Sequence, residues 1–150
     1  MAMKSGLKVS RRSTWTTCPF DSEEAIEANI WLGDTVGEMA LYYAMCEVAL
    51  LGGSFEKLGG QNLIEAAACG CPVIMGPHTF NFAEAAELAQ AAGAAQRVDD
   101  MAQGVQLAIR IANDGYLLTK SAKAALAFAA AHRGATLKTL SAMGSYLATR

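Results

Sequence analysis

The chain has 150 residues, of which 53% are hydrophobic and 17% are charged, and its formal net charge is -2. This length and composition are those of a globular domain with a real core, not of a disordered chain. The slight negative charge gives no reason to expect a nucleic-acid partner, and no apolar run approaches the roughly 20 residues that a membrane-spanning helix needs.

Short apolar runs alternate with helix-like segments over the first two thirds of the chain. Strands are predicted at residues 7–12, 29–33, 48–51, 72–75 and 95–98. Helices are predicted from Asp34 and Thr35 through Tyr43, over residues 61–69, and from Phe82 to Gly93. Residues 13–28 read as a long loop with an acidic turn at 21–27. This alternation is typical of an α/β fold: a Rossmann-like parallel sheet with helices on both faces.

From Asp99 onward the sequence predicts only helices, which form a helical tail. Two of them cover residues 101–112 and 116–132, and a third carries an apolar stripe at Leu137, Leu140, Gly144 and Leu147. We expect one domain over residues 7–150, with residues 1–6 as a start that takes no part in the fold.

Two loops that follow predicted strands carry the residue types of a ligand site. The first is glycine-rich, with Gly52, Gly53, Gly59 and Gly60, and the second reads Gly-Pro-His-Thr at residues 76–79. Loops that follow parallel strands gather at one edge of the sheet, where ligands bind. We therefore expect the functional site at this edge.

The glycine-rich loop does not match the commonest phosphate-binding motifs. Residues 52–60 are not G-x-G-x-x-G, and Gly60-Gln61 stands where a P-loop has Gly-Lys. This disfavours a nicotinamide dehydrogenase and a P-loop NTPase. The glycines are also explained if they only permit positive φ angles in tight turns.

One pattern, a capping residue with glutamate three positions later, occurs at Thr35/Glu38, Asn62/Glu65 and Asn81/Glu84. Each stands at the predicted start of a helix, where it fits a capping box or its asparagine analogue. We interpret Glu38 and Glu84 as caps. Two roles stay open for Glu65, because a carboxylate beside such a loop can also accept hydrogen bonds from sugar hydroxyls.

The remaining candidates for chemistry are weaker. His78 is either a backbone-bonded loop residue or a contact to phosphate or carboxylate. Ser54 lacks the G-x-S-x-G surroundings of a hydrolase nucleophile, and His132 is placed at a helix end without a catalytic role.

The four cysteines are Cys18, Cys46, Cys69 and Cys71, and we expect them to be reduced and mostly buried. Cys69 and Cys71 form C-x-C, but no second pair with ligand spacing follows, so we expect no metal site. The sequence indicates no cofactor.

Two stretches and their spacing closely resemble a known family. LGDTVGEM at residues 32–39 and LGGSFEKLGGQNLIEAAACGCPVIMGPHTFNF at residues 51–82 resemble the 3-deoxy-D-manno-octulosonic acid (Kdo) transferases of lipopolysaccharide synthesis. The resemblance runs from about Leu7 to the C-terminus. Its GDTxGE, GGS, GGxNxxE and MGPHTFNF motifs together are very specific.

The resemblance implies a two-domain GT-B glycosyltransferase. The C-terminal half of such enzymes binds the donor CMP-Kdo, and the N-terminal half binds a lipid A precursor. The family transfers Kdo with inversion and without a required metal, at the cytoplasmic face of the bacterial inner membrane. This chain resembles most of the C-terminal half, and alone we expect it to be soluble and inactive. The alternative is a non-catalytic nucleotide-binding or assembly module.

The resemblance also implies a set of donor-binding residues. They are Val36, Gly37, Glu38, Gly53, Ser54, Asn62, Leu63, Ile64, Glu65, His78 and Asn81. Residues 36–38 match one segment that contacts CMP and residues 62–65 a second, in which Glu65 is the expected ribose ligand. His78 and Asn81 are expected to face the phosphate or sugar of the donor. Gln61 stands where many relatives have histidine.

Two functional elements of the family precede the first matching residue. The catalytic glutamate lies in the N-terminal half, so no residue of this chain is expected to be catalytic. A Pro-Arg segment that helps to bind CMP is carried by the central strand of the sheet in related folds. Because exposed strand edges favour association, we expect the chain to close this gap or to fill it through a partner chain, as in a homo-oligomer.

Overall fold

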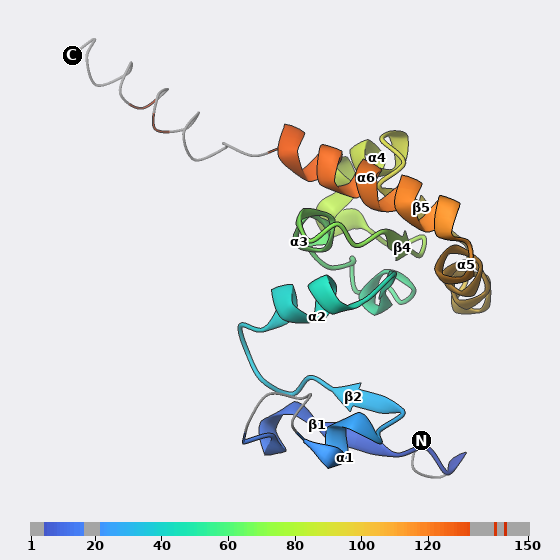
Figure 1. Cartoon of the computed structure of the whole chain (residues 1–150). Coiled ribbons are helices and arrows are strands. Elements are labelled where there is room, and N and C mark those ends of the chain that lie inside the picture. Colours follow the sequence, from blue (N-terminus) through green and yellow to red (C-terminus); the bar gives the residue numbers. More distant parts are fainter. Residues whose placement is uncertain (1–4, 17–21, 133–139, 141–142, 144–150) are drawn as a thin grey trace. The chain divides into compact units, whose positions relative to one another are not determined.

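The computed structural model describes residues 5–16, 22–132, 140 and 143. The chain divides into two compact units, Met1–Met39 and Ala40–Arg150. Each unit has its own parallel sheet, of two strands in the first and three strands in the second (Figure 1).

The first unit is a small β-α-β arrangement. Its strands are β1 (Val9–Arg11) and β2 (Ile30–Leu32), which pair in parallel with Val9 opposite Ile30. Between them lie the short 3-10 helix η2 (Arg12–Thr14) and the helix α1 (Glu23–Ile26). The Ser22 side chain caps α1 by accepting a hydrogen bond from the backbone of Ala25, so the predicted acidic turn is one turn of helix.

Two tryptophans make the core of this unit. The rings of Trp15 and Trp31 pack edge to face with centroids 5.1 Å apart, an arrangement that the quadrupoles of aromatic rings favour. The indole N–H of Trp15 donates to the hydroxyl of Ser10 on β1, and that of Trp31 donates to the carbonyl of Ala25 in α1, both at 2.7 Å. These bonds hold the segment after β1 and the helix α1 to the sheet.

The second unit contains the strands β3 (Ala49–Leu51), β4 (Val73–Met75) and β5 (Ala95–Arg97), all parallel and in the order β3-β4-β5. Its helices are α2 (Met39–Met45, which begins at the unit boundary), α3 (Leu63–Ala68), α4 (Ala83–Ala91), α5 (Met101–Asn113) and α6 (Gly115–Ala131). Two 3-10 helices, η4 (Gly52–Ser54) and η5 (Phe80–Phe82), follow β3 and β4.

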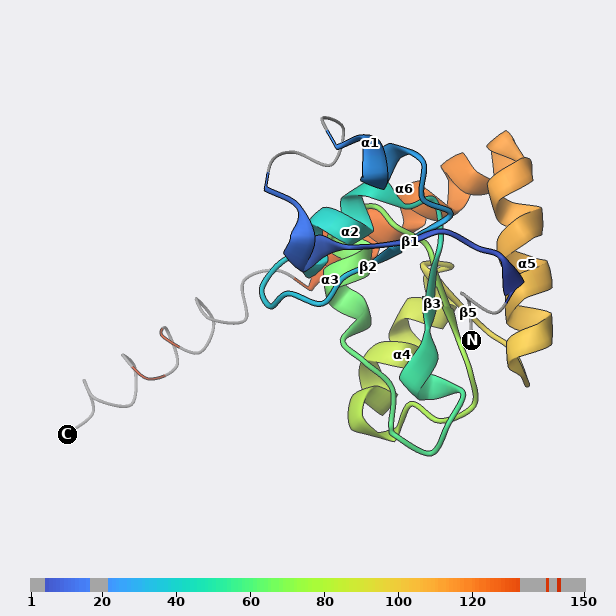
Figure 2. The ribbon, with the colours of Figure 1, turned by 90° about the horizontal axis from the view of Figure 1, so that it is seen from below.

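Helices cover both faces of the three-stranded sheet. Successive side chains along each strand point to opposite faces, so apolar strand residues pack against helices on either side. Leu51, Val73 and Met75 share one buried cluster with residues of α3, α4 and α6. On the other face α5 packs on β3 and β4, and Gly104 lets it approach so closely that a Cβ there would lie 3.3 Å from Leu50. In Figure 2, α5 stands beside α6, which it also contacts.

The predicted α/β fold with five parallel strands and helices on both faces is confirmed, and each predicted strand is present within two residues of its predicted ends. Among the described residues, the five strands form two separate sheets. The chain therefore does not make up for the missing central strand by pairing all five strands in one sheet. Within the same residues no helix has both the length and the apolarity of a membrane span. Of the predicted helix with the stripe Leu137, Leu140, Gly144 and Leu147, Leu140 is described and is helical, and the other three stripe residues lie outside the described residues.

One predicted helix start and one predicted cap are wrong. The helix predicted from Asp34 and Thr35 begins only at Met39, because Gly37 adopts a positive φ of 87° before it. Asn81 does not cap α4, whose N-cap is Phe82 without a side-chain hydrogen bond. The Asn81 amide donates instead to the carbonyl of Leu58, 23 residues earlier in the chain.

Candidate functional site

The loops that follow β3 and β4 are joined by Ser54. Its hydroxyl is fully buried, donates to the carbonyl of Leu51 at 2.5 Å and accepts from the backbone N–H of Gly76 at 2.7 Å. Its carbonyl accepts from the backbone N–H of His78 at 2.9 Å. A Cβ on Gly76 would lie 2.5 Å from this carbonyl oxygen, so only glycine permits the approach. Ser54 therefore fixes the position of both loops.

The glycine-rich loop closes on itself. The carbonyl of Gly53 accepts from the backbone N–H of Gly60, and the N–H of Gly53 donates to the side chain of Gln61, both at 3.1 Å. Gly59 and Gly60 have φ angles of 87° and 82°, which favour glycine. The loop thus returns beside its own start and delivers Asn62 to the beginning of α3.

Asn62 and Glu65 form a local pair at this helix start. The Asn62 side chain accepts from the backbone N–H of Ile64 at 3.1 Å and donates to Oε1 of Glu65 at 2.9 Å. The predicted cap is confirmed, although the glutamate bonds the side chain of Asn62 where a capping box would use its backbone N–H. Glu65 is exposed, and Leu63 is buried in the core beneath it.

His78 lies in the loop after β4, beside a cavity of about 430 Å³ whose lining also includes Thr79, Phe80, Glu87 and Arg97. Its backbone is bonded to Ser54, as one of the two sequence interpretations expects, and the residue also lines the cavity. Asn81 binds the glycine-rich loop: its backbone N–H donates to the carbonyl of Gly59, and its side-chain amide donates to the carbonyl of Leu58.

Arg97, at the end of β5, was missed by the sequence analysis. Its guanidinium donates to the carbonyl of Gly76 at 3.0 Å and to the hydroxyl of Thr79 at 3.1 Å. It therefore holds the loop of His78 from the third strand. A charged residue at the carboxyl end of a predicted strand was the signal that could have identified it.

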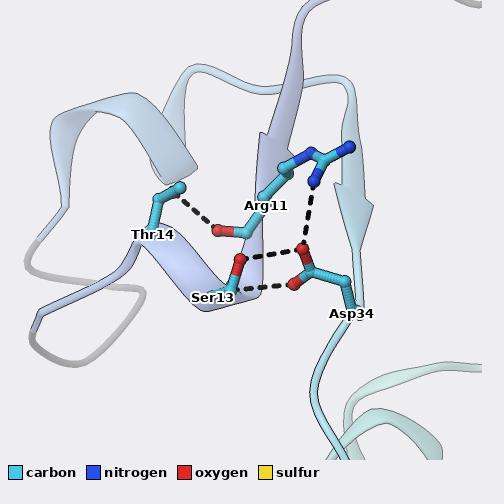
Figure 3. A network of polar contacts seen from close by, with 4 residues as sticks. All are labelled: Arg11, Ser13, Thr14 and Asp34. Atoms are coloured by element: carbon cyan, nitrogen blue, oxygen red, sulfur yellow. Dashed lines mark hydrogen bonds and ion pairs between the residues drawn. The ribbon is translucent and has the colours of Figure 1, made fainter.

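Residues 36–38 belong to the first unit, and the segment before them is bound to η2. Asp34 accepts from the backbone N–H of Ser13 at 2.9 Å and from its hydroxyl at 2.8 Å, and Arg11 lies 3.5 Å away (Figure 3). The hydroxyl of Ser13 is the main cause that lowers the pKa of the Asp34 carboxyl. Val36 and Gly37 are exposed at the tip of this segment.

Glu38 makes contacts that differ from those of a helix cap. It accepts a hydrogen bond from the hydroxyl of Thr35, which lowers the pKa of its carboxyl, and one from Arg12 at 2.7 Å, which lowers it further. The bond between Glu38 and Arg12 thus holds the segment before α2 against η2. The bond between Glu38 and Thr35 does not begin a helix, since α2 begins only at Met39.

The predicted site residues thus form two groups. One comprises Gly53, Ser54, Asn62, Leu63, Ile64, Glu65, His78 and Asn81, which lie on the joined loops and helix start of the second unit. The other comprises Val36, Gly37 and Glu38 of the first unit. Among the residues that the structure describes, no cluster of His, Cys, Asp and Glu could hold a metal ion.

No protein-family model matches the chain, but curated proteins do. A 3-deoxy-D-manno-octulosonic acid transferase of Bordetella pertussis is 47% identical over 142 residues, which are 95% of this chain and 32% of that protein. A transferase of the same name from Haemophilus influenzae is 45% identical over 74 residues, which are 49% of this chain and 16% of that protein. The chain therefore spans about a third of the length of the Bordetella relative.

A solved structure matches the fold. The crystal structure of the C-terminal CMP-Kdo binding domain of WaaA from Acinetobacter baumannii has a TM-score of 0.73 and 25% sequence identity to this chain. The match covers 85% of this chain and 63% of that one. Sequence and fold agree: the chain belongs to the 3-deoxy-D-manno-octulosonic acid transferase family and corresponds to its C-terminal domain.

Proposed function

We propose that this chain binds CMP-Kdo and forms the donor-binding part of a transferase that moves Kdo to a lipid A precursor. The observation that carries the proposal is the fold shared with the A. baumannii domain, which is described as CMP-Kdo binding. The loops that follow parallel strands are where such folds bind nucleotides.

In the second unit, Glu65 is the proposed ribose ligand. Asn62 holds Oε1 of its carboxylate, and Oε2 has no partner among the described residues, so an exposed acceptor is left for the ribose hydroxyls. Residues 62–64 place this carboxylate beside the glycine-rich loop. The pair of Asn62 and Glu65 is thus a cap that also presents a ligand.

Two further parts of this unit support the donor. Gly53 and Ser54 keep the glycine-rich loop closed and joined to the loop after β4, which we propose contacts the donor through its backbone. His78, which lines the cavity, is proposed to contact phosphate or sugar, while Asn81 acts by holding Gly59 and Leu58 in place.

In the first unit, Val36, Gly37 and Glu38 are proposed to contact CMP. Because Arg12 and Thr35 already bind the Glu38 carboxylate, we assign the contact chiefly to the exposed backbone of Val36 and Gly37. The acceptor and the general base that deprotonates its hydroxyl are assigned to the part of the family's proteins that this chain does not match.

Titration calorimetry with CMP tests the proposal on three proteins: the unaltered chain, Glu65→Gln and the control Glu47→Gln. Glu47 is exposed and precedes β3 at the opposite end of the strands, so the control makes the same charge change away from the loops. Glutamine can still accept the Asn62 hydrogen bond, which keeps the fold of Glu65→Gln intact.

We expect Glu65→Gln to bind CMP at least ~10-fold more weakly, since hydrogen bonds to a charged group contribute roughly 1.5–3 kcal/mol each. Glu47→Gln should bind like the unaltered chain. Equal binding by all three proteins contradicts the role of Glu65. Absence of binding by the unaltered chain at millimolar CMP contradicts donor binding by this chain alone.

A further inference from the structure

Two cysteine thiols meet at the amino ends of β3 and β4. Cys46 directly follows α2 and precedes β3, whereas Cys71 lies between α3 and β4. Their sulfur atoms are 3.2 Å apart, although 25 residues separate them in the chain. The pair lies at the opposite end of the strands from the loops of the candidate site.

The backbone around the pair is fixed by the sheet. Ala49 and Val73 are opposite each other in the parallel ladder, and the N–H of Ala49 donates to the carbonyl of Pro72 at 2.9 Å. The two thiols are thus held together by hydrogen bonds that do not depend on the sulfur atoms. Since a disulfide requires an S–S distance of about 2.05 Å, the sulfur atoms have to approach by only about 1 Å.

The two thiols are chemically unequal. Cys46 is exposed, while Cys71 is 1% exposed, so the expectation that the cysteines are mostly buried is wrong for Cys46. The hydrogen bond from Cys71 lowers the pKa of the Cys46 thiol to about 7. The same bond, followed by burial, raises the pKa of Cys71. Near neutral pH, Cys46 is therefore partly ionised and supplies the reactive thiolate, whereas Cys71 stays protonated.

We propose that Cys46 and Cys71 form a reversible oxidation site for hydroperoxides. The Cys46 thiolate attacks the oxygen of the peroxide that carries hydrogen, and the O–O bond breaks. The other oxygen takes a proton from solvent and leaves as water or an alcohol, so a sulfenic acid remains on Cys46. The Cys71 sulfur then displaces that oxygen: the S–O bond breaks, the S–S bond forms, and the oxygen leaves as water with the proton of Cys71.

The two steps together consume one peroxide and oxidise two sulfur atoms by one electron each. A small thiol or dithiol reverses them by thiol–disulfide exchange. The short distance to Cys71 favours the disulfide over further oxidation of Cys46. Once formed, the bond links the chain before β3 to the chain before β4 and restrains unfolding of the second unit.

The test treats the full chain with one equivalent of hydrogen peroxide at pH 7, followed by peptide mapping without reductant. Three variants accompany it: Cys46→Ser, Cys71→Ser and the control Cys69→Ser. Cys69 is the matched control because it lies two residues from Cys71 and its thiol donates to the carbonyl of Ala40 at 3.6 Å.

We expect a peptide that joins Cys46 to Cys71 in the unaltered chain and in Cys69→Ser, lost on addition of dithiothreitol and absent from the other two variants. Oxidation should raise the midpoint of thermal unfolding by about 10 °C, which is the stabilisation expected when a disulfide joins residues 25 positions apart. The exposed variant Cys46→Ser should show no such shift, which keeps the test valid if Cys71→Ser folds poorly.

Three results would overturn the proposal. One is a disulfide of Cys46 with Cys69 or with a second copy of the chain. Another is accumulation of sulfinic acid on Cys46 while Cys71 stays reduced. The third is an equal rate of peroxide consumption by Cys46→Ser and the unaltered chain.

Discussion

At the scale of single residues, the capping role of Glu65 is compatible with the ligand role that we propose for it. One carboxylate oxygen accepts from Asn62, which itself caps Ile64. The carboxylate is exposed and held in one orientation by a local hydrogen bond, so little conformational freedom remains to be lost when a ligand binds. The spacing of Asn62 and Glu65 predicts this pair, whereas it does not predict that one oxygen stays available.

The lowered pKa of Cys46 gives a pH-dependent prediction. Alkylation of Cys46 by iodoacetamide should be half-maximal near pH 7, since only the thiolate reacts. The negative charge of Glu47 acts in the opposite direction and raises the pKa of Cys46. The other titratable groups near these thiols are Tyr43 and Cys69. In Cys71→Ala the hydrogen bond is lost, so the midpoint should rise toward the value of about 8.5 of a free cysteine.

The measurement is the rate of Cys46 alkylation between pH 5.5 and 9.5, followed by mass spectrometry of its peptide. Above about pH 9 the Cys46 thiol is mostly deprotonated in both the unaltered chain and Cys71→Ala. The difference between their alkylation rates should therefore vanish there. A midpoint that is the same with and without Cys71 would show that the neighbouring thiol does not activate Cys46.

At the scale of elements, the sequence predicts well what depends on local spacing. The strands follow from short apolar runs, and α3 and α4 follow from apolar periodicity with Gly70 and Gly93 as stops. The start of α2 fails because Asp34 and Glu38 bind Ser13 and Arg12, which lie more than 20 residues earlier. Local spacing cannot reveal such partners.

The same reason explains two residues of the site region. Asn81 has the spacing of a cap, but its amide binds Leu58 across the fold. The position of Arg97 near the carboxyl end of a predicted strand is a signal for the loop edge, but the loop that it holds is defined only when β5 lies beside β4. In both cases a contact between distant segments decides the role of the side chain.

The junction of the loops after β3 and β4 gives a prediction for this scale. Gly76→Ala should lower the free energy of unfolding by about 1–3 kcal/mol, the usual cost of overpacking. Its Cβ would lie 2.5 Å from the carbonyl oxygen of Ser54 and 2.8 Å from Cα of Phe55, both backbone atoms. CMP affinity should fall too, because the two loops are forced apart.

Gly52→Ala is the matched control, since a Cβ there has no neighbour within 4 Å and the residue has no positive φ. Its free energy of unfolding, measured by urea denaturation, should stay within about 0.5 kcal/mol of the unaltered chain. Equal stability of the two variants would show that the loops are not packed together as described.

At the scale of the whole molecule, the fold class was predictable because five short apolar runs and their intervening helices define a parallel α/β protein. The division of the strands into the sheets β1-β2 and β3-β4-β5 could not be predicted from the sequence, since it depends on which strand edges pair with each other. Unpaired edges promote association. Filling of an edge by a partner chain stays a prediction, and sedimentation of the chain at several concentrations measures it.

The last prediction concerns the reaction. The chain alone should transfer no detectable Kdo from CMP-Kdo to a lipid A precursor, because it covers 32% of the Bordetella relative. A chimera in which the 142 matched residues of the B. pertussis transferase are replaced by this chain should transfer Kdo. We expect its rate to exceed that of the chain alone by at least about 1000-fold, since a positioned general base and an oriented acceptor contribute at least that much.

The chimera separates the two functions that the sequence leaves open. Donor binding with transfer, weakened by Glu65→Gln, supports a transferase half whose site includes that carboxylate. Donor binding without transfer, in a chimera whose folding is verified by its thermal unfolding, supports a non-catalytic nucleotide-binding module. Transfer by the chain alone would contradict the assignment of the base and acceptor site to the unmatched part, and would require a catalytic carboxylate among the residues of this chain.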